Sequence, residues 1–517
     1  MTVTAIVSLL VALGATGAAS LRWLRIAQRE HYLAGATTRF GLRWWRSTPL
    51  DLALALAGAA GIAASGFVAA FAVVPAVVAL VAPRGLGIRG RTSKLKWTRR
   101  LVTLSLALAV LDGLALAVGA LSAGLHGAVF AAACLTLLNP GVIDAALLAT
   151  RPLENRIASS FVREATARLQ SIDPIVVAVT GSYGKTSTKG YIAHLVSTER
   201  ATVASPRSYN NRAGLSRTVN EHLVAGTEVL VAEMGAYGPG EIAALCSWMS
   251  PRIAVITAIG PAHLERFKSL ERTLAAKAEI TTRAGVAILN VDDERLAGLA
   301  FRLEAEGKRV LRASGSNSSA DVAVLATSGG LELRLAGELI GAEAVAESEL
   351  PAATSNVACA VAVALELGLD PKSVLTRLGN LPVPANRLQR YVAGGGFVVL
   401  DDTFNSNPAG ARLALARLAA EAPGGRRVLV TPGMIELGRT QTEENAALGE
   451  ASAAVVSDLV IVGRTNRRAL GAGARRGNAR LSIVEVDRLG EAVAWVRERL
   501  GPGDAVLYEN DLPDHFP

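Results

Sequence analysis

The clearest indication of the fold class is residues 175–187, which read Ile-Val-Val-Ala-Val followed by Thr-Gly-Ser-Tyr-Gly-Lys-Thr-Ser. The first five are uniformly apolar, which is typical of a buried strand, and Lys189 to Val196 follows with a helical pattern. A glycine-rich turn between a strand and a helix directs backbone N–H groups and the helix N-terminus at phosphate groups. Val179 stands where the usual motif has its first glycine, so the match to the motif is incomplete. The position of the turn directly after a strand is therefore the stronger evidence for a nucleotide site. We call residues 180–187 the phosphate loop.

The residue types of the phosphate loop suit a bound nucleotide. Lys185 is expected to reach the terminal phosphates, and the Thr186 hydroxyl is expected to hold Mg²⁺. The residues expected to bind the nucleotide here are Gly181, Ser182, Gly184, Lys185, Thr186 and Ser187.

Two later apolar runs end in residues that can bind metal. Val229 to Ala232 is followed directly by Glu233, and Ile253 to Ile256 is followed by a loop that contains His263. Open α/β sheets bind ligands at the carboxyl ends of their strands, so both side chains are predicted to be metal ligands. A plain surface loop is the alternative for each residue, but the preceding buried strand and the flanking glycine and proline favour a site.

Three long apolar runs occupy the first third of the chain. Residues 1–21 and 52–83 hold no charge, and residues 101–143 hold only Asp112. A bilayer core about 30 Å thick needs roughly 20 apolar helical residues, so the first run predicts one membrane-spanning helix and each of the others predicts two short ones. Asp112 is either a functional acid inside the membrane or a residue near a helix end.

The net charge of +9 belongs to this same third. Residues 1–150 hold 13 Lys/Arg against four acidic residues, whereas the remainder holds 40 of each, which excludes a nucleic-acid-binding surface there. The basic stretches 22–46 and 84–100 are expected in the cytoplasm. This predicts a multi-pass protein of the inner or plasma membrane, with the N-terminus outside and the later domains cytoplasmic. A cleaved signal peptide is the alternative for residues 1–20, but signal peptides carry positive charge before the apolar run.

Several short segments between residues 172 and 510 form a recognisable series. Besides the phosphate loop, they are Asn210-Asn211-x-x-Gly214, Glu233-Met-Gly235, Gly260-Pro-Ala-His-Leu-Glu265, Lys277-Ala-Glu279, Asn290-Val-Asp-Asp293, Asn386-Arg387-Leu388, Asp401-Asp-Thr-Phe-Asn-Ser-Asn-Pro408, Gly433-Met-Ile-Glu-Leu-Gly438 and Gly503-Asp-Ala-Val-Leu507. In this order they resemble the motifs of the Mur ligases, ATP-dependent enzymes that build the peptide stem of peptidoglycan. The elements at 233–235 and 260–265 are most similar to those of the members that add D-alanyl-D-alanine.

The expected fold class is an α-helical transmembrane domain followed by two α/β domains. Strands and helices alternate again after residue 386, which predicts a second, smaller doubly wound domain of Rossmann-like type. The expected boundaries are 1–144 for the transmembrane domain with about five helices, 145–172 for a partly helical linker, 173–380 for the central ATP-binding domain and 381–517 for the C-terminal domain.

The resemblance implies an acyl-phosphate mechanism with ATP and two Mg²⁺ ions, and it assigns roles to matching residues. Lys185 would bind the β- and γ-phosphates, Thr186 and Glu233 the first ion, and His263 would help to place the second. Lys277 matches a lysine that is carbamylated in several members, where the carbamate is an anionic metal ligand. Its alternative is an ordinary lysine on a helix surface.

Three further matches concern the nucleotide. Asn356 corresponds to a residue that contacts adenine, Arg387 to one that reaches the phosphates from the C-terminal domain, and Asp402 to one that binds ribose. The sequence departs from the family where Ser355 replaces a histidine and Cys359 replaces an asparagine, which puts the adenine contacts in question.

Two larger departures concern the substrates. The segment 508–513 replaces the Lys-Gly-Ser sequence common at that point, which leaves the incoming amine open between an amino acid and a dipeptide. The soluble members carry an N-terminal domain that binds a UDP-sugar, and here the apolar region takes its place. We therefore expect a membrane-held cell-wall acceptor, such as a lipid-linked glycan or peptide, while a simple anchor with a soluble acceptor is the alternative.

The predicted activity is an ATP-dependent peptide ligase of cell-envelope synthesis that adds D-alanyl-D-alanine or another amino acid or dipeptide. One alternative is a membrane-bound synthase of poly-γ-glutamate type, which shares the ligase core. The other is a transport ATPase with a phosphate loop, which the scarcity of polar residues in the apolar runs disfavours.

Overall fold

The computed structural model describes residues 2–87, 94–206, 208–346, 350–351, 353–382, 388–404, 406–512 and 516. The chain forms two compact units. The first comprises Met1–Ile157 with Gly463–Thr465 and Leu512–Pro517, and the second comprises Ala158–Val462 with Asn466–Asp511.

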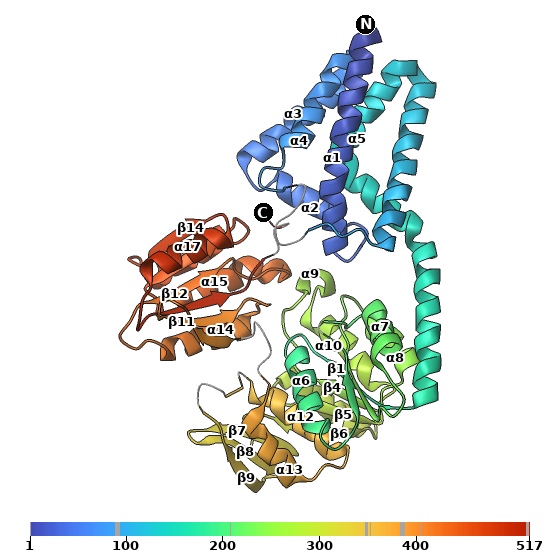
Figure 1. Cartoon of the computed structure of the whole chain (residues 1–517). Coiled ribbons are helices and arrows are strands. Elements are labelled where there is room, and N and C mark those ends of the chain that lie inside the picture. Colours follow the sequence, from blue (N-terminus) through green and yellow to red (C-terminus); the bar gives the residue numbers. More distant parts are fainter. Residues whose placement is uncertain are drawn as a thin grey trace. The chain divides into compact units, whose positions relative to one another are not determined.

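The first unit is helical (Figure 1). Its elements are α1 (Thr2–Arg29), α2 (Ala36–Trp45), α3 (Pro49–Ser65), η1 (Ala69–Ala72), α4 (Val73–Val81) and the part of α5 (Arg99–Ile172) up to Ile157. The last residues of α5 belong to the second unit. The backbone of α5 is non-helical at Ala123 and Gly124. Around this break a side chain on Gly119 would collide with the Gly127 carbonyl, so α5 is two helices that turn back on each other. The first apolar run forms α1, the second forms α3, η1 and α4, and the third forms the two helices of α5 on either side of the break. The stretch 145–172, expected as a partly helical linker, lies entirely within α5.

Membrane crossing is a separate matter from helix formation. By length and hydropathy, Thr2–Arg29 and Arg99–Ile172 qualify as spans, and the bent pair Ala36–Trp45 and Pro49–Ser65 would add a third. At about 1.5 Å per residue, α4 is too short to cross a bilayer alone. The expected five crossings, and the membrane itself, remain predictions.

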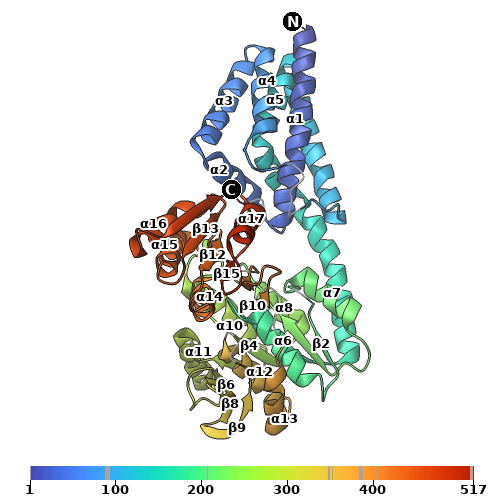
Figure 2. The ribbon, with the colours of Figure 1, turned by 60° about the vertical axis from the view of Figure 1, so that its left-hand side comes forward.

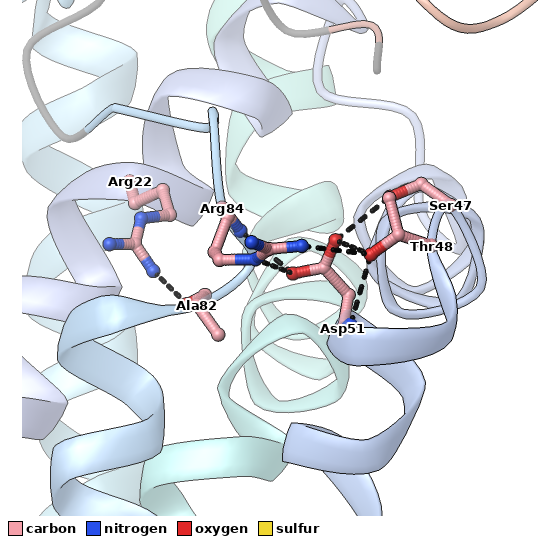
Figure 3. Close-up of polar contacts among 6 residues, drawn as sticks. All are labelled: Arg22, Ser47, Thr48, Asp51, Ala82 and Arg84. Carbon is pink, nitrogen blue, oxygen red and sulfur yellow. Dashed lines mark hydrogen bonds and ion pairs between the residues drawn. The ribbon is translucent and has the colours of Figure 1, made fainter.

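Two buried charged side chains of this unit, Asp51 and Arg22, bond to the ends of helices (Figure 3). Asp51, in the first turn of α3, is buried and accepts hydrogen bonds from the Thr48 hydroxyl at 2.6 Å and the Arg84 backbone N–H at 3.0 Å. Arg22 donates to the Ala79 carbonyl at 2.9 Å, at the C-terminal end of α4. The anion therefore lies at a helix N-terminus and the cation at a C-terminus, which complements the two helix dipoles.

The second unit begins with a nine-stranded sheet in the order β2-β3-β1-β4-β5-β6-β7-β8-β9, in which β7, β8 and β9 are antiparallel and the other pairs parallel. The strands are β1 (Ile175–Thr180), β2 (Thr202–Ala204), β3 (Val229–Glu233), β4 (Ile253–Ile256), β5 (Val286–Asn290), β6 (Arg309–Ser314), β7 (Val322–Thr327), β8 (Gly330–Leu335) and β9 (Glu338–Ala344). The helices are α6 (Lys185–Val196), α7 (Arg212–His222), α8 (Glu241–Met249), α9 (Leu264–Phe267), α10 (Leu270–Ala278), η2 (Glu279–Thr281), α11 (Glu294–Ala305), α12 (Thr354–Glu366), α13 (Pro371–Thr376) and η4 (Arg377–Asn380).

Helices cover both faces of this sheet. Apolar residues of α6 and α12 pack in one core, and those of α7, α8, α10 and α11 pack in another on the opposite face. This is the doubly wound arrangement that the apolar strands predicted. The strand pairing places β1 between β3 and β4, with Val179 beside Glu233 and Thr180 beside Ile256. The phosphate loop thus leaves the sheet between the two strands that precede Glu233 and His263.

The second sheet has six strands in the order β10-β11-β15-β12-β13-β14, and all except β10 are parallel (Figure 2). The strands are β10 (Gln389–Val392), β11 (Val398–Asp402), β12 (Arg427–Thr431), β13 (Asp458–Val462), β14 (Ser482–Val486) and β15 (Ala505–Glu509). The helices are α14 (Pro408–Ala420), η5 (Gly438–Thr440), α15 (Gln441–Ser452), α16 (Arg467–Gly477) and α17 (Leu489–Arg499). α14, α15 and α16 pack on one face and α17 on the other.

Candidate active site

The phosphate loop connects β1 to α6 in a shape that needs glycine. Gly184 has a φ of +79°, and a side chain at this position would collide with the Asn356 amide. Asn356 lies in the first turn of α12. The structure therefore brings Asn356 against the loop, which agrees with its expected place near the nucleotide.

Hydrogen bonds join the phosphate loop to the segment that follows β4. The Ser182 N–H donates to the Ala258 carbonyl at 2.8 Å, and the Ser182 hydroxyl exchanges hydrogen bonds of 3.1 and 3.0 Å with the Gly260 backbone. A side chain on Gly181 would collide with Thr257. These contacts hold the loop backbone in one conformation, which is what a preorganised phosphate site requires.

Lys185 and Thr186, the first residues of α6, face the end of β3. Lys185 Nζ lies 2.7 Å from the Gly181 carbonyl oxygen, and the Thr186 hydroxyl donates to Glu233 Oε2 at 3.0 Å. A hydroxyl and a carboxylate are oxygen ligands of the kind Mg²⁺ prefers, so these two residues fit the predicted ion. Among the residues that the structure describes, no group of three or more His, Cys, Asp or Glu gathers as a metal site.

Two residues around Glu233 had no predicted role. Lys189 donates to Glu233 Oε2 at 3.0 Å with both side chains buried, and the Asn210 amide donates to Oε1 at 3.1 Å. Burial acts to raise the pKa of Glu233, but Lys189 and Lys185 outweigh it and lower that pKa below its ordinary value. Lys189 could have been found from the sequence, because a position four residues after Lys185 lies on the same helix face.

His263 begins α9 and pairs with the C-terminal domain. Its Nδ1 hydrogen-bonds to Glu436, which lies in the segment after β12. The Tyr237 ring meets the imidazole edge to face, at 5.0 Å between centroids. The expected catalytic and metal-binding role of His263 remains a prediction. Its carboxylate partner Glu436 lies in the matching segment 433–438, to which the sequence analysis gave no role.

Lys277 is buried within α10, so it is not the surface lysine of the alternative interpretation. Burial, aided by the charge of Lys185, lowers its pKa to about 7, although Glu241 and Glu279 act in the opposite direction. An amine with such a pKa is about half neutral at pH 7, and a neutral amine is the form that reacts with CO₂. The environment therefore suits the proposed carbamate.

The remaining predicted residues belong to the C-terminal domain. Asp402 ends β11 and accepts a hydrogen bond from the Leu388 N–H at 3.1 Å. Arg387 lies outside the described residues. The expected ribose role of Asp402 and phosphate role of Arg387 remain predictions.

Comparison with known families identifies both α/β domains. Residues 179–364 match the Mur ligase middle domain, and residues 386–508 match the Mur ligase, glutamate ligase domain. Both matches begin after the N-terminal helices.

Individual relatives agree with this. The UDP-N-acetylmuramoyl-tripeptide–D-alanyl-D-alanine ligase of Mycobacterium leprae is 34% identical over 369 residues, 64% of this chain and 70% of the relative. The enzyme of the same name from Escherichia coli is 30% identical, over 61% of this chain and 72% of the relative. The solved structure of MurF from Acinetobacter baumannii has a TM-score of 0.59 at 25% identity, covering 68% of this chain and 77% of that one. MurF ligase from Thermotoga maritima, solved in complex with ADP, has a TM-score of 0.57 at 25% identity, covering 68% and 80%.

The fold and site define an ATP-dependent ligase that forms an amide bond. The chain belongs to the Mur ligase family.

Proposed function

We propose that this ligase joins D-alanyl-D-alanine, or another amino acid or dipeptide, to a carboxylate of a cell-envelope precursor at the membrane. The observation that carries the proposal is the contact of Thr186, in the phosphate loop beside Lys185, with Glu233. The chain that holds it is 34% identical to a UDP-N-acetylmuramoyl-tripeptide–D-alanyl-D-alanine ligase.

The proposed reaction has two steps. In the first step the acceptor carboxylate attacks the γ-phosphorus of ATP, and the bond between this phosphorus and the β–γ bridging oxygen breaks. ADP departs, and the acceptor becomes an acyl phosphate. The amine nitrogen then attacks the acyl carbon, phosphate departs from the tetrahedral intermediate, and the nitrogen loses a proton. Two anions meet in the first step, so positive charge has to screen them.

The chain's residues divide this work. Lys185 neutralises the β- and γ-phosphates, and the N-terminus of α6 orients them through backbone N–H groups. Thr186 and Glu233 hold Mg²⁺, which when bound screens the negative charge of the phosphates and the carboxylate.

The remaining roles are those that the family resemblance implies. Asn356, Asp402 and Arg387 bind adenine, ribose and phosphate. His263 and a carbamate on Lys277 complete a second ion site.

The acceptor is proposed to be membrane-held. In the sequence, the helical first unit takes the place of the domain with which, by the family resemblance, soluble members bind a UDP-sugar. A module that keeps the acceptor near the ATP site raises the effective concentration of the acceptor. The catalytic domains are accordingly proposed to be cytoplasmic.

Mass spectrometry of products tests this function. The purified full chain receives Mg-ATP, D-alanyl-D-alanine or single amino acids, and either a UDP-linked muramoyl tripeptide or a membrane lipid extract. We expect a dipeptide or amino-acid mass on the lipid-linked acceptor and no product from Lys185→Ala. If the added mass appeared on the UDP-linked substrate alone, the acceptor would be soluble and the first unit would serve only as an anchor. A ladder of repeated additions would indicate a polymer synthase, and ATP turnover with no product would contradict the ligase.

A further inference from the structure

We propose that Glu436, in the C-terminal domain, is a positioning residue that orients His263 for the reaction at the ATP site of the central domain. The inference rests on the proposed function, because it assumes that His263 serves that site. Nothing in the family resemblance assigns Glu436 a role.

The hydrogen bond with Glu436 determines which imidazole nitrogen of His263 keeps a lone pair that can bind a metal ion. An ionised carboxylate only accepts hydrogen bonds, so His263 Nδ1 carries the proton that it shares with Glu436. In a neutral imidazole the lone pair then lies on Nε2. Among the described residues Nε2 has no hydrogen-bond partner. Metal-binding histidines commonly use one nitrogen as ligand while the other donates to a carboxylate that fixes the ring.

Glu436 is held by more than this bond. Its backbone carbonyl accepts a hydrogen bond from the Glu265 N–H at 3.2 Å, and its other carboxylate oxygen lies 3.7 Å from the Arg266 guanidinium. Arg266 in turn stacks over the Tyr237 ring, at 4.3 Å from the centroid, and that ring contacts His263. His263 and Arg266 of the central domain thus both contact the Glu436 carboxylate, and Tyr237 packs against both of them.

The backbone at this contact is also unusual. His263 has a φ of +56° and Glu436 a φ of +63°, in the left-handed region that non-glycine residues seldom adopt. A side chain on Gly438 would lie 3.3 Å from the Glu265 nitrogen, so the two loops meet backbone to backbone. Strained residues that a surrounding structure maintains gather at functional sites.

The consequence is a link between the two domains. His263 presents a defined Nε2 only while Glu436 is in contact, so the ATP site is complete only when the C-terminal domain is docked. The pair is about a quarter exposed, at 28% for His263 and 24% for Glu436, and such pairs add little to stability. Removing the carboxylate should therefore alter the site and leave the fold intact.

Substitutions in the full chain test the proposal. We expect Glu436→Gln to lower kcat by about ten-fold or more, which is the usual loss when the carboxylate behind a metal-binding histidine is removed. KM for ATP should change little. Glu443→Gln removes an exposed acid of the same domain and serves as the matched control, with wild-type kcat expected. If Glu436 acts through His263, the double variant with His263→Ala should be no slower than His263→Ala alone. Independent, multiplicative losses would overturn the proposal.

A spectroscopic measurement tests the same contact without turnover. The chain has six histidines, so ¹⁵N-histidine NMR of the detergent-solubilised protein can follow each ring, with His263→Ala to assign the signal. We expect His263 to show the Nδ1–H form in the wild type and to lose it in Glu436→Gln. An unchanged signal would overturn the proposal. If the wild type proved to have no ligase activity, the proposed function would fail while this measurement still reported on the pair.

Discussion

Glu233 receives hydrogen bonds from a lysine, a hydroxyl and an amide, and the lysine sets its charge. With Lys189 replaced by methionine, burial would act with one fewer opposing charge, so the pKa of Glu233 would rise. A protonated carboxyl cannot bind Mg²⁺, so the acid limb of the pH–rate profile should move to higher pH, with kcat/KM several-fold lower on that limb. Lys189→Arg keeps the charge and should keep the wild-type profile. The measurement is kcat/KM against pH at saturating Mg²⁺, and an unshifted acid limb in Lys189→Met would show that Lys185 alone maintains the carboxylate.

Lys277 is a second residue whose protonation decides its chemistry. Because burial lowers its pKa to about 7, the amine is available to form a carbamate near neutral pH. We expect Lys277→Ala to lose at least about ten-fold in kcat and to recover part of it with added formate or acetate, since a short carboxylate can take the place of the carbamate as an anionic ligand. Lys372→Ala, at an exposed lysine of α13, is the control and should change nothing. Full activity of Lys277→Ala would remove this residue from the site.

At the scale of elements, the turn into α6 depends on a glycine. Gly184→Ala would place a methyl group against the Asn356 amide at a φ of +79°, so both the clash and the backbone oppose it. We expect at least about ten-fold weaker binding of a fluorescent ADP analogue, as the loop N–H groups lose their alignment. Gly190→Ala, within the same helix and with no atom within 4 Å of the new methyl group, should keep nucleotide binding and stabilise the protein by about 0.5–1 kcal/mol. Equal nucleotide binding by the two variants would show that binding does not require glycine at position 184.

Strand β15 carries a buried acid that makes stability depend on pH. Glu509 is fully buried, accepts hydrogen bonds from Ser406 and from Thr431, and has a pKa raised to about 8 by burial and by the charge of Asp402. A raised pKa means that the folded state binds the proton more tightly, so this stabilisation is complete below the unfolded pKa of about 4.5 and is lost as pH rises through about 8. We expect unfolding free energy to fall by about 1–3 kcal/mol from pH 6 to pH 9 in the wild type, and by less in Glu509→Gln. Chemical denaturation at the two pH values measures this, with the exposed Glu498→Gln as control. An identical pH dependence in Glu509→Gln would show that the acid does not titrate in this range.

What could be predicted of these elements follows from how local their signals are. Buried parallel strands such as β1, β3 and β4 are continuous apolar runs, so they are visible in the sequence. The antiparallel strands β8 and β9 were not predicted, because their partly exposed residues make no such run. Helix α6 begins at Lys185, earlier than the pattern from Lys189 suggested, because its first turn is polar and faces the site.

The same reasoning applies to the site. Residues that lie at strand ends, such as Glu233, follow from the fold alone. The pairing of His263 with Glu436 joins two domains across 173 residues, and only the three-dimensional structure contains it.

At the scale of the whole molecule, the distribution of charge predicts how the chain lies in a cell. Thirteen of its 53 Lys/Arg precede residue 151, and they gather in two stretches between apolar helices, so the positive-inside rule places those stretches in the cytoplasm. We expect the full chain to remain in membranes after alkaline carbonate washing, because α1 and α5 have the length and hydropathy of spanning helices. Protease added to inside-out vesicles should digest residues 158–511, whereas protease added to intact spheroplasts should spare them. A chain released by carbonate would be peripheral, and digestion in spheroplasts would place the ATP site on the side of the membrane that lacks ATP.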